Sequence, residues 1–239
     1  MKAHARLIVV VAGLALSALP GLALTANGQA GAGQAGAPGQ GRAGAPQTPP
    51  PPPPPPFASN CDFAEGTTAR YKVAEQLVGI SFGNEAVGST QAVTGTLALA
   101  ADGTVNPAQS KILVDLKTLK SDQALRDGYL QRNTLQTDKF PTLEFVPKRA
   151  TGLPSPFPTA QRPTPMGVQL VGDMTLHGVT AEVTWNVAAT VTGETIAGRA
   201  LTSFPFSTFN LTKPSVPLLA SADDKIQLEV EFRCKRTPI

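Results

Sequence analysis

The chain has 239 residues, among them 20 Lys and Arg, 17 Asp and Glu, 2 His and 2 Cys. This length allows one large domain or two small ones, and so few His and Cys residues argue against an iron–sulfur cluster or a multi-ligand zinc site built by this chain alone. Lys2, Arg6 and Arg42 precede residue 57 and no acidic residue does, so 17 of the 20 basic residues accompany all 17 acidic ones in the remainder. A neutral remainder offers no basic stripe for phosphates, which argues against nucleic-acid binding.

Residues 1–26 have the pattern of a secretory signal peptide. Lys2, His4 and Arg6 precede an apolar run over Leu7–Leu19, and small residues follow the run. A charged start, an apolar stretch of about 13 residues and a small-residue end are typical of such a signal. The alternative is an uncleaved membrane anchor, because the run can be extended to Leu24 and a span needs about 20 residues.

Residues 27–56 are predicted to be a disordered linker. Residues 27–48 are almost entirely Gly, Ala, Gln and Pro, which bury too little apolar surface to fold. Pro49–Pro56 is an unbroken run that predicts a polyproline II rod of about 25 Å. The linker is either a spacer that holds the domain away from a membrane or wall, or a tail without a partner.

Residues 57–239 are predicted to form one all-β domain, because apolar and polar residues alternate along them. A period of two indicates antiparallel strands with one dry face and one wet face. About eight strands are expected, with clear alternation at 111–117, 168–176, 182–192 and 226–232 and weaker alternation at 70–82, 92–101, 142–150 and 195–204. Turns are predicted at Ala101-Asp102-Gly103, His177-Gly178 and Gly193, and long Pro-rich loops at 152–165 and 205–224.

One segment departs from this alternation. Ser121 can cap a short helix over Asp122–Leu130, with the Asp122 carboxylate in its first turn. Leu125 and Tyr129 lie four residues apart and are predicted to share the inward face of this helix. A single short helix in a β domain usually covers one end of a barrel or one face of a sheet.

Cys61 and Cys234 lie near the two ends of the domain and are predicted to form a disulfide, as expected for two cysteines in a secreted chain. The bond requires Cα atoms about 5–6 Å apart, so the entry to the first strand has to lie beside the end of the last strand. This closure favours a barrel. A tie across the ends of an open sandwich is the alternative.

The sequence shows no catalytic pattern. His177 is the one histidine of the domain, and the glycine that follows it favours a turn over a catalytic base. The carboxylate pairs Asp223/Asp224 and Asp122/Asp127 are interpreted as charges on a solvated loop and on a helix face. No phosphate-binding glycine loop or nucleophile elbow occurs. We therefore expect a protein that is not an enzyme and has no metal site.

The inward faces decide what the barrel can hold. They combine large apolar residues such as Trp185 and Phe232 with Gly95, Gly172 and Ala189, and they carry no charge where the alternation is clear. An eight-stranded barrel either fills its interior with side chains or holds one small ligand. The residues alone leave both open, because small residues can provide room or can let a tapering core pack. A cavity with such walls would suit a long apolar molecule.

Three motifs in fixed order resemble the YceI-like family: Leu125-Arg126-Asp127-Gly128-Tyr129-Leu130, Lys139-Phe140-Pro141-Thr142-Leu143-Glu144-Phe145 and Gly172-Asp173-Met174-Thr175-Leu176-His177-Gly178-Val179-Thr180. The resemblance covers most of residues 65–234. It implies an extended, lipocalin-like antiparallel barrel with a helical cap. It also implies an apolar tunnel for a polyisoprenoid or another long amphiphile, such as an isoprenoid quinone, in a bacterial secreted or periplasmic protein.

We therefore predict a binding or carrier protein for such a lipid, with no cofactor other than a bound isoprenoid lipid or quinone. Contact with a membrane is expected only transiently or through an uncleaved leader. The alternative is a cell-envelope protein with a packed core that acts through its surface. Tyr129, Arg126 and Asp127 are predicted to orient the head group at the rim. The side chains predicted to line the tunnel are Leu97, Leu99, Ile112, Val114, Leu125, Tyr129, Phe145, Leu170, Met174, Trp185, Val187, Ala189, Leu228 and Val230.

Overall fold

The computed structural model describes residues 59–63, 65–79, 83–100, 104–154, 157–158, 161–217 and 219–238. The strands of this part are β1 (Ser59–Phe63), β2 (Thr68–Leu77), β3 (Asn84–Thr90), β4 (Val93–Leu99), β5 (Lys111–Asp115), β6 (Lys120–Ser121), β7 (Thr142–Thr151), β8 (Thr164–Leu176), β9 (Val179–Thr192), β10 (Thr195–Phe204) and β11 (Leu219–Pro238). The helical segments are η1 (Leu116–Thr118), α1 (Ala124–Tyr129), η2 (Leu130–Thr134) and η3 (Phe206–Phe209).

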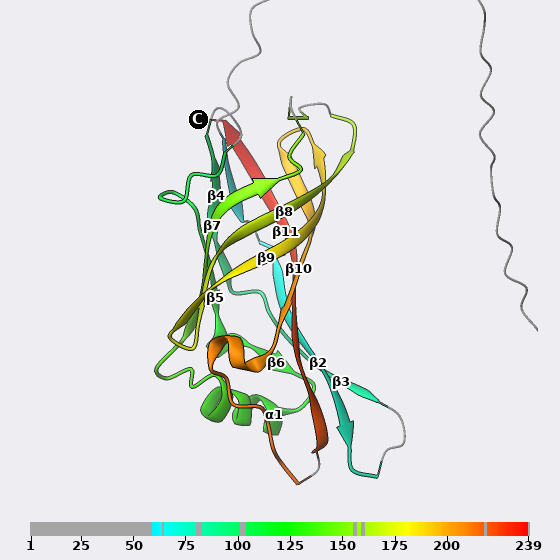
Figure 1. Cartoon of the computed structure of the whole chain (residues 1–239). Helices are drawn as coiled ribbons and strands as arrows, with labels where there is room; N and C mark the ends of the chain where they lie inside the picture. Colours follow the sequence, from blue (N-terminus) through cyan, green and yellow to red (C-terminus); the bar gives the residue numbers. More distant parts are fainter. Residues whose placement is uncertain are drawn as a thin grey trace, which may run out of the picture. The chain divides into compact units, whose positions relative to one another are not determined.

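The sheet closes into a barrel because β1 pairs with both β4 and β11 (Figure 1). The sheet order is β1-β4-β5-β7-β8-β9-β10-β11-β2-β3-β6, with an additional pairing between β1 and β11. The closed ring therefore runs through β1, β4, β5, β7, β8, β9, β10 and β11, and all of its pairings are antiparallel. The predicted eight-stranded antiparallel barrel is confirmed, and the open sandwich is excluded.

The ring continues at one end as a second tier of strands. β11 is 20 residues long, so residues near its end pair with β1 while its earlier part pairs with β2. β2 in turn pairs with β3, and β3 pairs with the short β6. In Figure 1 this tier lies at the end of the barrel that carries α1. The sequence prediction contained neither β1 nor β3, because these short segments show little alternation.

The hairpin of β8 and β9 shows how the alternation builds the wall. Val183, Trp185 and Val191 are buried on β9, whereas Thr184 and Asn186 between them are exposed. The two strands stay in register from one end to the other. Each strand therefore turns its apolar residues to the interior and its polar residues to water.

The turns predicted at His177-Gly178 and Gly193 are confirmed. His177 and Gly178 have φ values of 53° and 74°, which suit the two-residue turn between β8 and β9. Gly193 has a φ of 59° between β9 and β10. The turn predicted at residues 101–103 and the predicted leader and linker over residues 1–56 lie outside the described residues.

Both long loops are shorter than predicted. β8 begins at Thr164 and β11 at Leu219, so the strands include the last residues of the segments predicted as loops at 152–165 and 205–224. Pro165 is compatible with a strand because the pairing of β7 with β8 reaches only as far as Gln169. The missing N–H of Pro165 therefore interrupts no ladder between β7 and β8.

The helix begins later than predicted, and Ser121 does not cap it. The N-cap is Gln123, and Ser121 belongs to β6 instead. The N–H and Oγ of Ser121 donate to Oδ1 of Asp127 at 2.8 and 2.7 Å. Residues two apart lie on nearly opposite sides of a helix. Leu125, two residues before Asp127, is 88% exposed and not buried, and together with Tyr129 it borders the open end of the barrel interior.

The predicted disulfide joins Cys61 of β1 to Cys234 of β11. The two Cα atoms are 5.4 Å apart, and 173 positions separate the cysteines along the chain. Phe157, Val191 and Ile196 pack around the disulfide in a second buried cluster. In Figure 1 the end of β11 that carries this bond lies opposite α1. One end of the barrel is therefore tied and packed.

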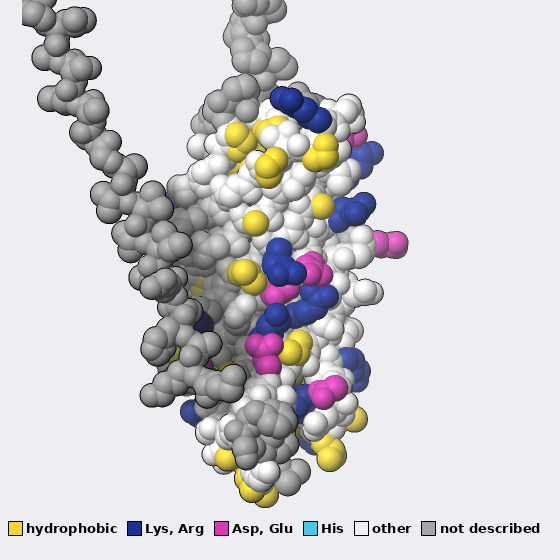
Figure 2. All heavy atoms as spheres, turned by 90° about the vertical axis from the view of Figure 1, so that its right-hand side faces the viewer, with side chains coloured by type: hydrophobic (Ala, Val, Ile, Leu, Met, Phe, Trp, Pro, Cys, Tyr) yellow, Lys and Arg dark blue, Asp and Glu magenta, His cyan; other side chains and the backbone are white. Residues whose placement is uncertain are grey.

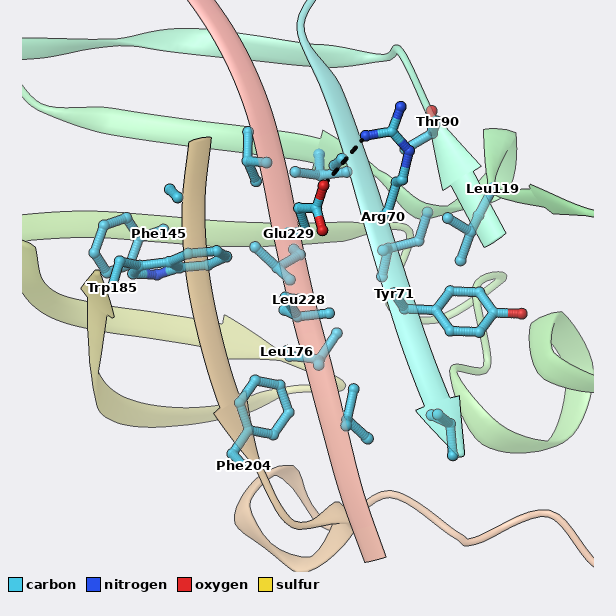
Figure 3. Close-up of a pocket in the computed structure, with 18 of the residues that line it drawn as sticks. Arg70, Tyr71, Thr90, Leu119, Phe145, Leu176, Trp185, Phe204, Leu228 and Glu229 are labelled. Atoms are coloured by element: carbon cyan, nitrogen blue, oxygen red, sulfur yellow. Dashed lines mark ion pairs between the residues drawn. The ribbon is translucent and has the colours of Figure 1, made fainter. Parts of the chain in front are cut away.

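The outer wall carries an ion-pair network across β2, β10 and β11. The Glu229 carboxylate is 5% exposed and lies 3.6, 3.1 and 3.3 Å from the nitrogens of Arg70, Lys72 and Arg199. Glu231 pairs with Arg70 and Arg199, and their hydrogen bonds hold its pKa below the usual range. Figure 2 shows acidic and basic side chains gathered on the middle of one wall. These pairs connect three strands, and two of the residues, Arg70 and Glu229, also border the interior (Figure 3).

Glu229→Gln is expected to lower the free energy of unfolding by about 1–3 kcal/mol, because a buried charged hydrogen-bond acceptor is lost. The neutral amide would leave three cations close together without their shared carboxylate. Urea denaturation at neutral pH measures the change. Glu231→Gln is the matched control and should cost less, because Glu231 is 41% exposed. Equal losses in the two variants would contradict this account.

Candidate functional site

The barrel encloses a cavity of about 860 Å³. Its lining extends from Cys61 and Phe232 near the disulfide to Val78, Leu125 and Val216 at the end that carries α1. Every strand of the closed ring contributes inward side chains to it. Figure 3 shows part of the wall, with the ring of Trp185 beside Phe145. A volume of about 300–1,000 Å³ is usual for small-molecule sites, so this interior can hold a ligand.

The predicted tunnel residues lie on this cavity with one exception. Met174 is fully buried and packs in the main core cluster, where it pairs across the strands with Phe145. Met174 is therefore not among the residues that border the cavity. The predicted residues that do line the cavity are Leu97, Leu99, Ile112, Val114, Leu125, Tyr129, Phe145, Leu170, Trp185, Val187, Ala189, Leu228 and Val230. Their contact with a ligand remains a prediction.

The prediction missed the part of the lining that β2 and the η3 region provide. Ala69, Tyr71 and Val73 of β2 point to the cavity at a spacing of two, and Phe204 and Phe206 join them from the end of β10 and from η3. The alternation in β2 was a usable signal. The aromatic residues on either side of Pro205 gave no such sequence signal, because they lie where the regular alternation of β10 ends and η3 begins.

The room in the interior does not come from the inward glycines. A Cβ on Gly95 would overlap the Lys111 carbonyl oxygen, and one on Gly172 would overlap that of Val146. These glycines therefore allow neighbouring strands to approach closely. Alanines such as Ala189 and Ala200 do line the cavity. Their short side chains leave interior space that larger residues would fill.

One charged pair of the lining lies beside α1. Arg126 Nη2 is 3.2 Å from Oε1 of Glu75, and both side chains are largely buried. Arg126 Nη1 also pairs with the Asp122 carboxylate. The guanidinium is thus neutralised within the protein. Of the predicted head-group residues, Asp127 hydrogen-bonds to Ser121, and Tyr129 is half-buried on the lining.

In the buried residues of the lining, two polar atoms have no hydrogen-bond partner among the described residues. They are the Nε1–H of Trp185 and Oγ1 of Thr134, and both residues are buried. Buried polar groups are nearly always hydrogen-bonded. These two atoms could therefore bond to water or to polar atoms of a ligand inside the cavity.

Burial raises the pKa of Tyr71 to about 12, against the opposing effect of the nearby Arg126 guanidinium. The ordinary value is 10.0, so the folded state keeps the phenol protonated where the unfolded chain ionises. Stability is therefore full below about pH 10 and should fall as the pH rises from about 10 to about 12. Absorbance titration of the phenolate in Tyr129→Phe, in which Tyr71 is the remaining tyrosine, measures this directly. Ionisation near pH 10 in the folded variant would contradict the expected shift.

His177, the one histidine of the domain, has a structural role in a turn. The His177 ring packs edge-on against Phe140 with centroids 4.8 Å apart, in the turn between β8 and β9. Within the described ranges, no group of three or more His, Cys, Asp and Glu residues is arranged to hold a metal ion. No helix in those ranges is long and apolar enough to cross a membrane.

Comparison with known proteins agrees with this geometry. The sequence profile of the YceI-like domain matches residues 64–234. No curated protein sequence matches the chain significantly. A polyisoprenoid binding domain from Saccharophagus degradans, implicated in plant cell wall breakdown, has a similar fold at 10% identity and a TM-score of 0.55, over 76% of this chain and 100% of that one.

Two other solved structures are similar at lower scores. Burkholderia cenocepacia BcnA matches at 14% identity and a TM-score of 0.48, over 70% of this chain and 95% of its own. The Campylobacter jejuni YCEI protein matches at 14% identity and a TM-score of 0.48, over 63% of this chain and 84% of its own.

Proposed function

This chain belongs to the YceI-like domain family, and we propose that it is a carrier that holds one long, uncharged isoprenoid lipid in its barrel outside the cytoplasm. The observation that carries the proposal is the cavity of about 860 Å³ whose walls are almost entirely apolar side chains. Burial of an apolar tail against such walls is favourable by about 25 cal/mol per Å² before the costs of association. The polyisoprenoid binding domain of similar fold supports this class of ligand.

The charges around the cavity favour an uncharged head group. Of the three cations that line the cavity, Arg126 is already paired with Glu75 and Asp122, Arg70 is paired with Glu229 and Glu231, and Arg132 is exposed to water. A diphosphate head would have to displace these carboxylates, which is costly for largely buried pairs. The unpartnered Nε1–H of Trp185 suits a carbonyl or hydroxyl oxygen instead. An isoprenoid quinone or alcohol therefore fits better than an isoprenoid diphosphate.

A location outside the cytoplasm is supported by two features. Residues 1–26 have the pattern of a secretory signal. The Cys61–Cys234 disulfide is the kind of bond that persists in oxidising compartments. The absence of a recognisable catalytic arrangement in the described residues is consistent with a carrier rather than an enzyme.

Extraction of natively purified protein with organic solvent, followed by mass spectrometry, is expected to yield one isoprenoid lipid in near-stoichiometric amount. Delipidated protein should then bind an isoprenoid quinone more tightly than an isoprenoid diphosphate with the same tail. Preference for the diphosphate would overturn the uncharged head group. Protein that carries no lipid and takes up neither probe would overturn the carrier function and favour a protein that acts through its surface.

A further inference from the structure

The large apolar side chains that are exposed lie together at the mouth of the cavity. Within the part of the chain that the structure describes, they are Val78, Leu125 and Val216, which are 59%, 88% and 37% exposed. All three also line the cavity. They come from three separate segments: the turn after β2, the helix α1 and the loop before β11. We call these three residues the apolar rim.

The three segments converge on the same end of the barrel. Figure 1 shows α1, the far end of β2 and the start of β11 at the lower end, away from the C-terminus. Hydrophobic side chains are also visible at the lower end in Figure 2. Isolated exposed apolar residues need no explanation, but a group of them around an opening marks an interaction site.

We propose that the apolar rim inserts into the surface of a lipid bilayer, so that the lipid passes between membrane and cavity without crossing water. This inference rests on the proposed carrier function. The rim is continuous with the apolar lining, so a tail that leaves the cavity would meet Val78, Leu125 and Val216 first. A protein partner would have to cover the opening through which the ligand moves, whereas a bilayer accepts the tail itself.

The charges near the rim indicate which bilayer is needed. Asp122 precedes α1, Arg132 of η2 follows it, Lys213 lies in the loop before β11, and Asp223, Asp224 and Lys225 lie near the start of β11. Neither sign prevails around the opening. Binding to anionic lipids requires a cluster of basic residues, so the rim should dock by apolar contact and a zwitterionic phosphatidylcholine bilayer should suffice.

Membrane contact can be tested without any ligand, in full-length protein carrying Leu125→Trp. Quenching of the introduced indole by phosphatidylcholine with brominated acyl chains would show insertion of the rim. The matched control is Thr237→Trp, at an exposed position of β11 beside the disulfide end. Trp185, the one native tryptophan, gives the same background in both variants. The proposal expects strong quenching at position 125 and little at 237; equal quenching at both, or none at either, would overturn it.

A second experiment connects the rim to lipid transfer. The triple variant Val78→Ser, Leu125→Ser and Val216→Ser should take up an isoprenoid quinone from phosphatidylcholine vesicles about tenfold more slowly. It should still bind the same quinone added from ethanol, because the inner walls are unchanged. The control Val78→Ile, Leu125→Met and Val216→Ile keeps the rim apolar and should transfer at the normal rate.

The outcomes separate the two proposals. If the wild type binds quinone but the serine triple takes it up from vesicles at the normal rate, the rim proposal is wrong and the carrier function stands. If the wild type never binds quinone but Leu125→Trp is quenched, the rim docks and the carrier function is wrong. Concentration-dependent self-association that the serine triple abolishes, without quenching at position 125, would assign the rim to a second copy of the chain and overturn docking to a bilayer.

Discussion

Simultaneous replacement of both cysteines, Cys61→Ser with Cys234→Ser, is expected to lower the free energy of unfolding by about 2–5 kcal/mol. The bond closes a loop of 173 positions, for which the loss of chain entropy in the unfolded state corresponds to about 5 kcal/mol. It also fixes β1, a five-residue strand that closes the ring between β4 and β11. Without the disulfide, only the backbone hydrogen bonds of β1 with β4 and β11 would remain to hold the barrel closed.

Chemical denaturation of the oxidised wild type and the double variant measures this loss, and amide exchange should accelerate first in β1. Both cysteines are buried, so serine hydroxyls at these positions add a cost of their own. The matched control, Cys61→Ala with Cys234→Ala, removes the bond without adding polar groups. If the alanine pair were as stable as the wild type, the loss in the serine pair would come from buried hydroxyls and not from the missing closure.

Ala200→Trp is expected to abolish most binding of an isoprenoid quinone while the protein still folds. Ala200 lies on the cavity wall of β10, where its partners across the strands are Val187 and Val230. An indole at this position would project into the cavity and would occupy space that a lipid tail needs. In a filled interior the same substitution would cost about 1–3 kcal/mol through overpacking; in this cavity the space is already present.

The control for this experiment is Ala188→Trp, which places the same indole on the opposite face of the wall. Ala188 is exposed on β9 and pairs with Arg199 of β10. It should leave both quinone binding and stability nearly unchanged. Thermal unfolding and a quinone-binding titration are measured on both variants. Normal quinone binding by Ala200→Trp, or a severe loss of stability with no loss of binding, would contradict the assignment of the cavity as the lipid site.

The alternation of residues was sufficient to predict the antiparallel wall. A strand with a period of two has one apolar face, and that face has to leave water in any antiparallel fold. Trp185, Val187 and Ala189 could therefore be assigned to the interior without knowledge of their neighbours. The disulfide could also be predicted from the sequence, since two cysteines in a chain with a predicted secretory signal have few alternatives. That bond favoured a closed barrel, but only the pairing of β1 with both β4 and β11 excluded an open sandwich.

The tertiary structure alone decided how the interior is occupied. Alternation tells which side chains face inward, but it does not tell how far apart the opposite walls lie. Met174 and Ala189 belong to equally inward faces, yet one packs in the filled part of the core and the other borders the cavity. The high exposure of Leu125 could not be predicted from the local sequence either, because it depends on where the hydrogen bonds between Asp127 and Ser121 hold α1. Spacing between walls and contacts between distant segments are properties of the assembled barrel, and they determine both the cavity and its apolar rim.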